Sequence, residues 1–282
     1  MNNFLAYIIY FLNIITNAIG KVLIAPLITH LPGWLSNTII SAVTGVAILF
    51  VFKYTSNQKA IGNVKDRIKA NTLAIKLYKD YVSVTLLSLA RVLKGTFAWL
   101  FHSIRPILVM MIPFSLLFGQ MWMWYQARPL LPGEQAIVTM KLNGDTYSKW
   151  PQVNIASLPG AEITIEKTKV LTKRQLYWKI KAADNGCHSI RFKVDNDIVE
   201  KQLAVGNGFM RTSSLRPGWK FSDMLLYPFE KPFKSDSIVK SIRIRYPDRI
   251  SKTSGTNWWI AYLLVISSIF FLLLKPVFKV NF

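Results

Sequence analysis

Three long apolar runs interrupt a chain of otherwise mixed polarity and predict membrane-spanning helices. They cover residues 35–52, 106–125 and 258–274. An α-helix rises about 1.5 Å per residue, so each run is close to the ~20 residues that cross a hydrocarbon core of about 30 Å. The last run begins with two tryptophans and is followed by Lys275, as expected for a helix that returns to the cytoplasmic side.

A fourth apolar segment, residues 4–24, leaves two interpretations open. Its polar positions recur every three or four residues and form one stripe of a helix: Tyr10, Asn13, Asn17 and Lys21. The helix either spans the membrane with this stripe turned toward other helices, or lies in the interface as an amphipathic helix. We favour the interfacial position for this N-terminal domain, residues 1–33, and expect Pro26, Pro32 and Gly33 to end the helix.

The segment between the first two spans predicts the orientation of the chain. Residues 53–105 contain ten lysines and arginines but only two acidic residues. Loops of this length that are rich in lysine and arginine remain in the cytoplasm. We therefore expect a multi-pass protein of the cell inner membrane, with residues 53–105 cytoplasmic and residues 126–256 on the opposite side.

The cytoplasmic segment is predicted to be an antiparallel helical hairpin. The first span is expected to continue as a helix to Lys79, because no proline interrupts it. Its heptad positions a and d follow a coiled-coil pattern: Ile61, Val64, Ile68, Ile75, Tyr78 and Val82. The return arm, residues 81–104, is expected to turn its own apolar face toward them: Leu86, Leu89, Leu93, Phe97 and Leu100. This arm is not expected to span, since Arg91 and Lys94 would each cost about 2.5–3.5 kcal/mol in the bilayer.

Residues 126–256 change to an alternation of apolar and basic residues with a period of two. The alternation is clearest in residues 178–181, 190–194 and 242–246, and glycine-containing turns separate these runs. Strands of this kind bury one face and expose the other to solvent, which predicts an immunoglobulin-like antiparallel β-sandwich. The segment holds 22 basic and 12 acidic side chains, so its wet face either solubilises the domain or binds an anionic lipid or glycan. Together with the helices, the expected fold is an α-helical membrane protein with an inserted extracytoplasmic β domain, followed by a spanning helix and short tail in residues 257–282.

The sequence offers little catalytic chemistry. It contains no G-x-S-x-G, Walker, H-E-x-x-H or C-x-x-C motif. Its single cysteine rules out an intramolecular disulfide framework, and its three scattered histidines supply few ligands for a metal. The expected membrane segments hold no acidic residue, which argues against proton pumping. We expect no enzyme activity, no cofactor, no metal and no specific nucleic-acid partner.

Three groups of residues are candidates for binding. A polar stripe on the two central spans either packs helices or lines a client groove: Asn37, Ser41, Thr44, Ser115 and Gln120. A methionine cluster either fills space or forms an adaptable hydrophobic slide: Met110, Met111, Met121 and Met123. The hairpin cations either attract anionic lipid or contact a cytoplasmic partner: Lys59, Lys65, Arg67, Lys69, Lys76 and Lys79.

The order of these parts resembles the YidC/Oxa/Alb insertase superfamily, especially its short archaeal and endoplasmic-reticulum branches. The similarity covers residues 34–125 and is carried by the junction at residues 52–59, the stretch 64–69 and the proline-containing helix at residues 108–114. The resemblance implies a groove that accepts hydrophobic client segments without a cofactor. The chain departs from that family in lacking an arginine within the helices and in carrying the outward β domain.

Two functions therefore remain open. The first is an insertase-like chaperone that binds nascent membrane proteins, with the hairpin contacting a ribosome or translocon. The second is a cell-envelope scaffold or binding protein, in which the helices serve as an anchor in the lipid bilayer and the β domain recognises an anionic envelope ligand or a partner.

Overall fold

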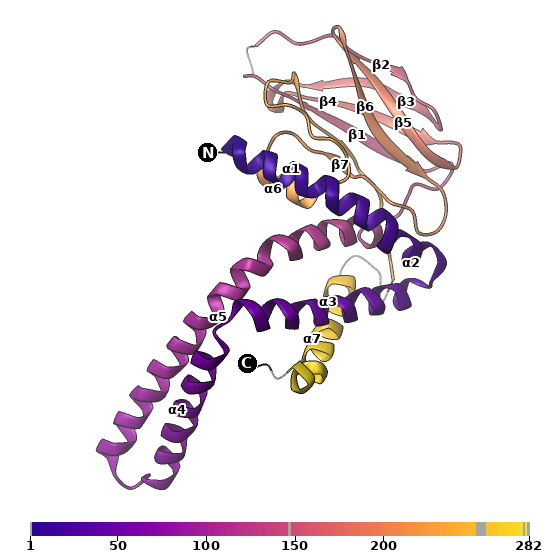
Figure 1. The fold of residues 1–282 in the computed structure, drawn as a ribbon. Coiled ribbons are helices and arrows are strands. Elements are labelled where there is room, and N and C mark those ends of the chain that lie inside the picture. Colours follow the sequence, from indigo (N-terminus) through magenta and orange to yellow (C-terminus); the bar gives the residue numbers. More distant parts are fainter. Residues whose placement is uncertain (1, 146–147, 252–257, 279, 281–282) are drawn as a thin grey trace. The chain divides into compact units, whose positions relative to one another are not determined.

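The computed structural model describes residues 2–145, 148–251, 258–278 and 280 (Figure 1). It divides into two compact units, one of residues 1–38 with 115–262 and the other of residues 39–114 with 263–282. Four helical segments are long and apolar enough to cross a membrane: Ala6–His30, Gly33–Thr55, Val82–Tyr125 and Trp258–Phe278. The expectation of apolar spanning helices joined to an antiparallel β domain is confirmed at this level.

The N-terminal segment is longer than the sequence predicts. Helix α1 (Asn2–Ile19) continues through a π-helical turn, η1 (Gly20–Ile24), into α2 (Ala25–His30). Pro26 does not end the helix, because it lies in the first turn of α2, where a missing N–H is tolerated. The helix stops at His30 instead, since Leu31 is extended ahead of Pro32.

The predicted continuous helix from the first span to Lys79 is wrong. Helix α3 (Gly33–Thr55) ends, and α4 (Gln58–Leu77) starts anew after Asn57. The Asn57 side chain accepts a hydrogen bond from the N–H of Ala60 at 3.0 Å, so an asparagine N-cap restarts the helix without any glycine or proline. The heptad pattern also ends early, because Tyr78 and Val82 flank the turn that follows α4.

Helix α5 (Val82–Tyr125) joins the predicted return arm and the predicted second span in one helix. Pro106 and Pro113 lie inside it, and each removes one backbone donor without ending the helix. Figure 1 shows α4 and the first half of α5 running side by side in opposite directions, as the predicted hairpin requires. The part of α4 and α5 in the second unit also contacts α3 and α7 (Trp258–Phe278) through a cluster that includes Phe52, Ile61, Trp99 and Phe271.

The face that α5 turns toward α4 is the opposite of the one expected. A side chain added at Gly95 would lie 2.7 Å from Ile68, and Ser88 is buried, so small residues line this contact. The predicted apolar face is exposed instead: Leu86, Leu89, Leu93, Phe97 and Leu100. Small residues therefore take part in the α4–α5 contact, and the leucines of α5 lie on its exposed side.

The β domain consists of two antiparallel sheets. The larger has the order β3-β4-β1-β8-β7 and the smaller the order β2-β5-β6. The bounds are β1 Gln135–Leu142, β2 Val153–Ser157, β3 Ala161–Val170, β4 Gln175–Ala182, β5 Gly186–Val194, β6 Asp197–Val205, β7 Leu215–Arg216 and β8 Val239–Ile244. A short 3₁₀ turn, η2 (Leu171–Lys173), connects β3 to β4, and helix α6 (Phe221–Leu226) follows β7. This strand order differs from the two sheets of an immunoglobulin domain, so the immunoglobulin-like topology is not found.

Alternation along the strands builds the core of the domain. In β1, Val138, Met140 and Leu142 are fully or almost fully buried, while the residues between them face outward. Trp178 and Phe192 meet in this core with ring centroids 5.3 Å apart. The wet and buried faces therefore follow the period of two that the sequence predicts.

The two connections between the β domain and the helices lie next to each other. Ala127 and Asp248 form an antiparallel bridge, and Arg128 N–H donates to the carbonyl of Pro247 at 3.0 Å. Arg249 N–H in turn donates to the carbonyl of Gln126 at 3.1 Å. The domain thus begins and ends on paired backbone, although residues 252–256, which the sequence assigns to it, lie outside the described residues.

Candidate functional site

The predicted polar stripe of α3 is enclosed by protein. Asn37 and Ser41 are fully buried, and Thr44 donates its hydroxyl to the carbonyl of Ile40 at 2.7 Å. In the second unit, a side chain added at Gly45 would lie 2.5 Å from the carbonyl oxygen of Ser267 on α7. Close backbone approach at glycine and serine is the usual role of small residues between membrane helices. The stripe residues of α3 are therefore buried, and α3 approaches α7 closely at the adjacent Gly45.

Gln120, the buried member of the stripe on α5, belongs to a polar cluster with α1. Its amide donates to Asn17 Oδ1 at 2.8 Å, and Arg211 Nη2 donates to Gln120 Oε1 at 2.9 Å. Arg211 also lies over the ring of Phe229, 4.3 Å from its centroid. Burial lowers the pKa of Arg211 to about 10, so the guanidinium still carries its charge at neutral pH. Ser115, the remaining predicted groove residue, is half-buried.

Arg211 brings a positive charge to the amides of Asn17 and Gln120. It lies in the β domain segment before β7, 91 positions from Gln120. Gly20 permits the approach, since a side chain there would come within 2.7 Å of Gln120 Oε1. Nothing in the local sequence marks this arginine, because neither a periodic pattern nor a motif connects residues 20, 120 and 211.

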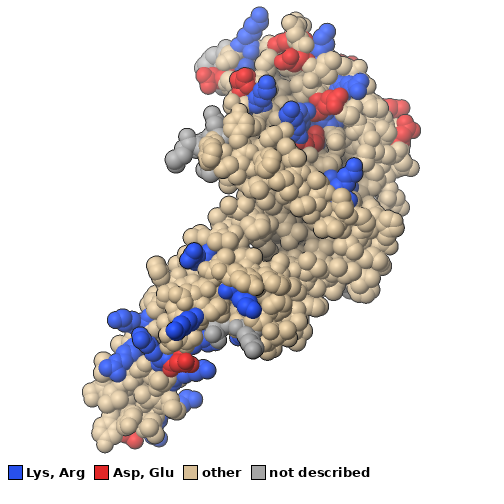
Figure 2. All heavy atoms as spheres, viewed as in Figure 1, with Lys and Arg blue, Asp and Glu red and all other residues tan. Residues whose placement is uncertain are grey.

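The other predicted groups are placed as follows. Met121 and Met123 are buried, Met110 is half-buried, and Met111 is exposed. The hairpin cations on α4 and its following turn are exposed, except for half-buried Lys65: Lys59, Arg67, Lys69, Lys76 and Lys79. Figure 2 shows basic side chains gathered over this hairpin.

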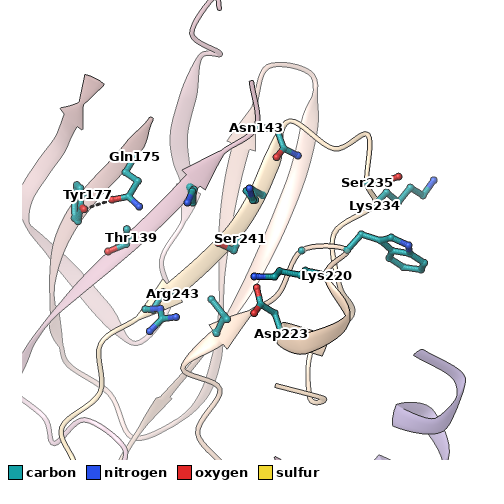
Figure 3. A pocket seen from close by; sticks show the side chains of 15 residues that line it. Thr139, Asn143, Gln175, Tyr177, Lys220, Asp223, Lys234, Ser235, Ser241 and Arg243 are labelled. Atoms are coloured by element: carbon teal, nitrogen blue, oxygen red, sulfur yellow. Dashed lines mark hydrogen bonds between the residues drawn. The ribbon is translucent and has the colours of Figure 1, made fainter. Parts of the chain in front are cut away.

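A cationic groove lies on the outer face of the larger sheet of the β domain. Its volume is about 740 Å³. Five basic side chains line it: Lys141, Lys220, Lys234, Lys240 and Arg243. Asp223 is the one acidic residue in this lining, and Figure 3 shows it turned toward Lys220.

Strand register builds the floor of the cationic groove. Thr139 of β1 lies opposite Arg243 of β8 and, on the other side, opposite Tyr177 of β4. Lys141 lies between Ser241 and Gln175 in the next outward row. Since outward residues of neighbouring strands share one face, these polar groups point into the same space, as Figure 3 shows.

The rim of the groove comes from the segment between β7 and β8. Gly218 is pressed against β8, because a side chain there would lie 2.3 Å from the carbonyl oxygen of Lys240. This contact places Lys220 over one edge of the floor, while Lys234 and Ser235 occupy another (Figure 3). Among the described residues, none of the five basic side chains of the groove makes an ion pair. Apart from Lys220, which faces Asp223, their charges are therefore available to a ligand.

A buried ion pair fastens the rim segment to the smaller sheet. The ammonium of Lys201 on β6 is fully buried and contacts a carboxylate oxygen of Glu230. Ser213 hydrogen-bonds both groups, and Gln202 N–H donates to the other carboxylate oxygen at 3.2 Å. Burial lowers the pKa of Lys201, while the charge of Glu230 opposes that shift. A serine beside a lysine can act as a nucleophile, but this pair is enclosed and the lysine is bound to a carboxylate, so its role is structural.

Next to the cationic groove lies a smaller aromatic hollow of about 550 Å³. It is lined by Tyr7 and Tyr10 of α1, by Trp219, and by residues 231–236. Trp219, Lys234 and Ser235 line both cavities, so the two are contiguous.

Within the described residues, no three His, Cys, Asp or Glu side chains come together to form a metal site. Comparison with protein-family models, curated protein sequences and solved structures finds no match to the chain.

Proposed function

We propose that this chain is a membrane-anchored binding protein of the cell envelope whose β domain binds an anionic ligand in the cationic groove. The observation that carries the proposal is the convergence of five basic side chains, against one acid, on a single concavity. Basic residues scattered over a surface only make a domain soluble. Here the register of β1 and β8 and the rim segment bring them to one place.

The magnitude of the attraction fits a binding role. Two unit charges 4 Å apart attract by about 1 kcal/mol in water and more where solvent is partly excluded. At about 1 kcal/mol for each of the five basic side chains, the attraction would reach about 5 kcal/mol, which corresponds to binding in the submillimolar range. Clefts lined by one sign of charge also concentrate ligands of the opposite sign.

The helices act as the anchor in this proposal. α1 packs along α6, with Asn13 Nδ2 donating to the carbonyl of Met224 at 2.8 Å and Asn17 Nδ2 to that of Pro228 at 2.6 Å. Because α6 carries Ser222 and Asp223, this contact favours α1 in the interface over a spanning position. The basic hairpin remains cytoplasmic, and the β domain is extracytoplasmic.

Titration of the full-length protein in dodecyl maltoside with inorganic tripolyphosphate, followed by calorimetry, tests the proposal. The double variant Lys141→Gln/Arg243→Gln removes two charges from the floor of the groove and should weaken binding about thirtyfold, equivalent to about 2 kcal/mol. The matched control Arg191→Gln/Lys193→Gln removes two charges from the outer face of the other sheet and should leave the affinity unchanged. Equal losses in both variants would mean that binding is diffuse and not located in the groove.

An insertase-like function is the second candidate, favoured by the cluster of Asn17, Gln120 and Arg211. A half-buried arginine beside two amides offers a charged, hydrogen-bonding surface to a polar segment of a client chain. In this proposal, client helices contact the apolar residues of α5, and the hairpin contacts the ribosome or translocon.

Insertion of a newly synthesised single-span protein into vesicles containing the purified chain tests this candidate. Arg211→Gln should reduce insertion, while Arg211→Lys, which keeps the charge, should retain most of it. Arg245→Gln, at an exposed position, serves as the control. Full insertion by Arg211→Gln, together with no crosslinking of clients to a photoreactive group at Ser115, would exclude the function.

A further inference from the structure

The aromatic hollow differs from the cationic groove in the chemistry of its walls. Tyr7 meets Trp219 edge to face, with ring centroids 5.0 Å apart and planes at 69°. Tyr10, about one turn further along α1, has its ring centroid 6.3 Å from that of Trp219. Pro232 adds a further apolar wall. A free anion in the cationic groove would leave these surfaces unused.

The hollow also borders the exposed apolar face of α1. The polar stripe of α1 is occupied by the hydrogen bonds to Met224 and Pro228, so its other face points away from the protein. That face is exposed and apolar: Phe4, Ile8, Phe11, Ile15 and Ile19. Tyr7 lies at its edge and is 63 % exposed. An amphipathic helix of this kind lies at the level of lipid headgroups, where tyrosine and tryptophan also gather.

The two cavities therefore form a continuous path from the basic side chains of the groove to the exposed apolar face of α1. Lys220 lines only the groove, the adjacent Trp219 lines both cavities, and Tyr7 lines only the hollow. Lys234 stands at the junction, where it can contact a phosphate. The acids along this path are Asp223 in the groove and Asp236 in the hollow, which leaves a net positive lining.

We propose that the ligand of the cationic groove is an anionic lipid, with its phosphate among the basic side chains and its chains crossing the aromatic hollow toward α1. This inference rests on the proposed function of the groove and names the class of its ligand. A zwitterionic lipid is disfavoured, because its cationic group would enter a lining that is already positive. A soluble anion of the same charge would bind the groove without contacting Tyr7.

The experiment uses the full-length protein in nanodiscs of dioleoyl phosphatidylcholine, with empty nanodiscs as the blank. Calorimetry compares three probes: dihexanoyl phosphatidylglycerol below its micellar concentration, glycerophosphoglycerol, which is the same headgroup without chains, and dihexanoyl phosphatidylcholine. The anionic lipid should bind at least about tenfold more tightly than its headgroup, since the chains bury apolar surface. The zwitterionic lipid should show no binding above the blank.

Variants separate the two cavities. Tyr7→Ser should reduce the affinity for the anionic lipid severalfold and leave that for glycerophosphoglycerol unchanged. Phe11→Ser, one turn further along the exposed face of α1, should alter neither. Trp219→Leu should act like Tyr7→Ser, and the exposed position of Tyr7 keeps the test valid if Trp219→Leu fails to fold.

The outcomes distinguish this inference from the function on which it rests. Equal affinity for the anionic lipid and its headgroup would overturn the lipid assignment while leaving an anion-binding groove. If Lys141→Gln/Arg243→Gln and the control Arg191→Gln/Lys193→Gln lost the same affinity for tripolyphosphate, the proposed anion-binding function of the groove would itself be overturned. Equal binding of both lipids would show that hydrocarbon alone is recognised and would also overturn the proposal.

Discussion

Removing one partner of the buried Lys201–Glu230 pair should destabilise the β domain far more than breaking one of its surface ion pairs. Lys201→Met leaves the Glu230 carboxylate buried with only Ser213 and the N–H of Gln202 as close donors. Leaving one charge of such a pair without its partner costs about 3–5 kcal/mol. Because Glu230 lies on the rim segment, the cationic groove should loosen together with the core.

Two further variants make the argument quantitative. Lys201→Met/Glu230→Gln removes both charges, so it should recover most of the stability lost in the single variant. Arg191→Met breaks the exposed pair with Glu200, where N and O are 3.0 Å apart and both side chains are more than half exposed. That change should cost no more than about 1 kcal/mol.

The direction in which stability changes with pH is an independent test of the buried pair. In Glu230→Gln, Lys201 is buried without a counter-charge, so its folded-state pKa falls further below the ordinary value near 10.4. The unfolded state then binds more protons than the folded state between these two pKa values. Stability therefore rises with pH through this window, by up to about 1.4 kcal/mol per pH unit. The variant should gain stability relative to the unmodified protein as the pH rises toward the ordinary pKa of lysine.

Thermal unfolding of the full-length protein in dodecyl maltoside, followed by circular dichroism of the strands, measures these effects. Hydrogen exchange of the β6 amides reports the local free energy of opening of the same region. The reasoning is refuted if Lys201→Met and Arg191→Met lower the unfolding temperature equally, or if Glu230→Gln becomes less stable than the unmodified protein as the pH rises.

Three other substitutions test separate parts of the fold. Asn57→Ala should cost about 1 kcal/mol and speed hydrogen exchange in the first turn of α4, whereas Asn57→Asp keeps the cap and should not. Glu134→Gln disrupts the two hydrogen bonds from Arg128, at 2.7 and 2.8 Å, and should cost about 1 kcal/mol at pH 7. Since Arg128 lowers the pKa of Glu134, this stabilisation is present above about pH 4.3 and is lost as the pH falls through the lower folded-state value, so melting curves at pH 7 and pH 3 should differ less in the variant. Gly45→Leu should push α3 away from Ser267 and lower the melting temperature of the helices, while Val43→Leu, at an exposed position of α3, should change little.

The sequence predicts those helices and strands whose order of apolar and polar residues follows directly from which of their faces are buried. The apolar run of α3 and the alternation in β4, β5 and β8 appear in the structure close to their expected bounds. The break at Asn57 was missed because an asparagine cap is a weaker signal than glycine or proline. The α4–α5 contact was assigned to the wrong face, because leucines were expected to pack inward as they do in water, whereas Ser88 and Gly95 form the contact.

The candidate site could be predicted only in part. The outward positions of β1 and β8, such as Lys141 and Arg243, follow from the alternation, and a basic wet face was expected. The rim could not be inferred, because Lys220 and Lys234 lie in the segment between β7 and β8, which has no strand pattern to place it beside the floor. The contact of Arg211 with Gln120 joins distant parts of the chain and leaves no periodic trace.

The paired backbone at Ala127 and Asp248 makes the β domain a cassette within the chain. Its two ends leave the helices side by side, joined by hydrogen bonds at Gln126 and Pro247. A short loop could bridge this gap, so the whole cassette can be excised or exchanged without stretching the flanking helices. The chain is thus suited to genetic dissection, in which the anchor and the receptor portion are produced, recombined and assayed as separate parts.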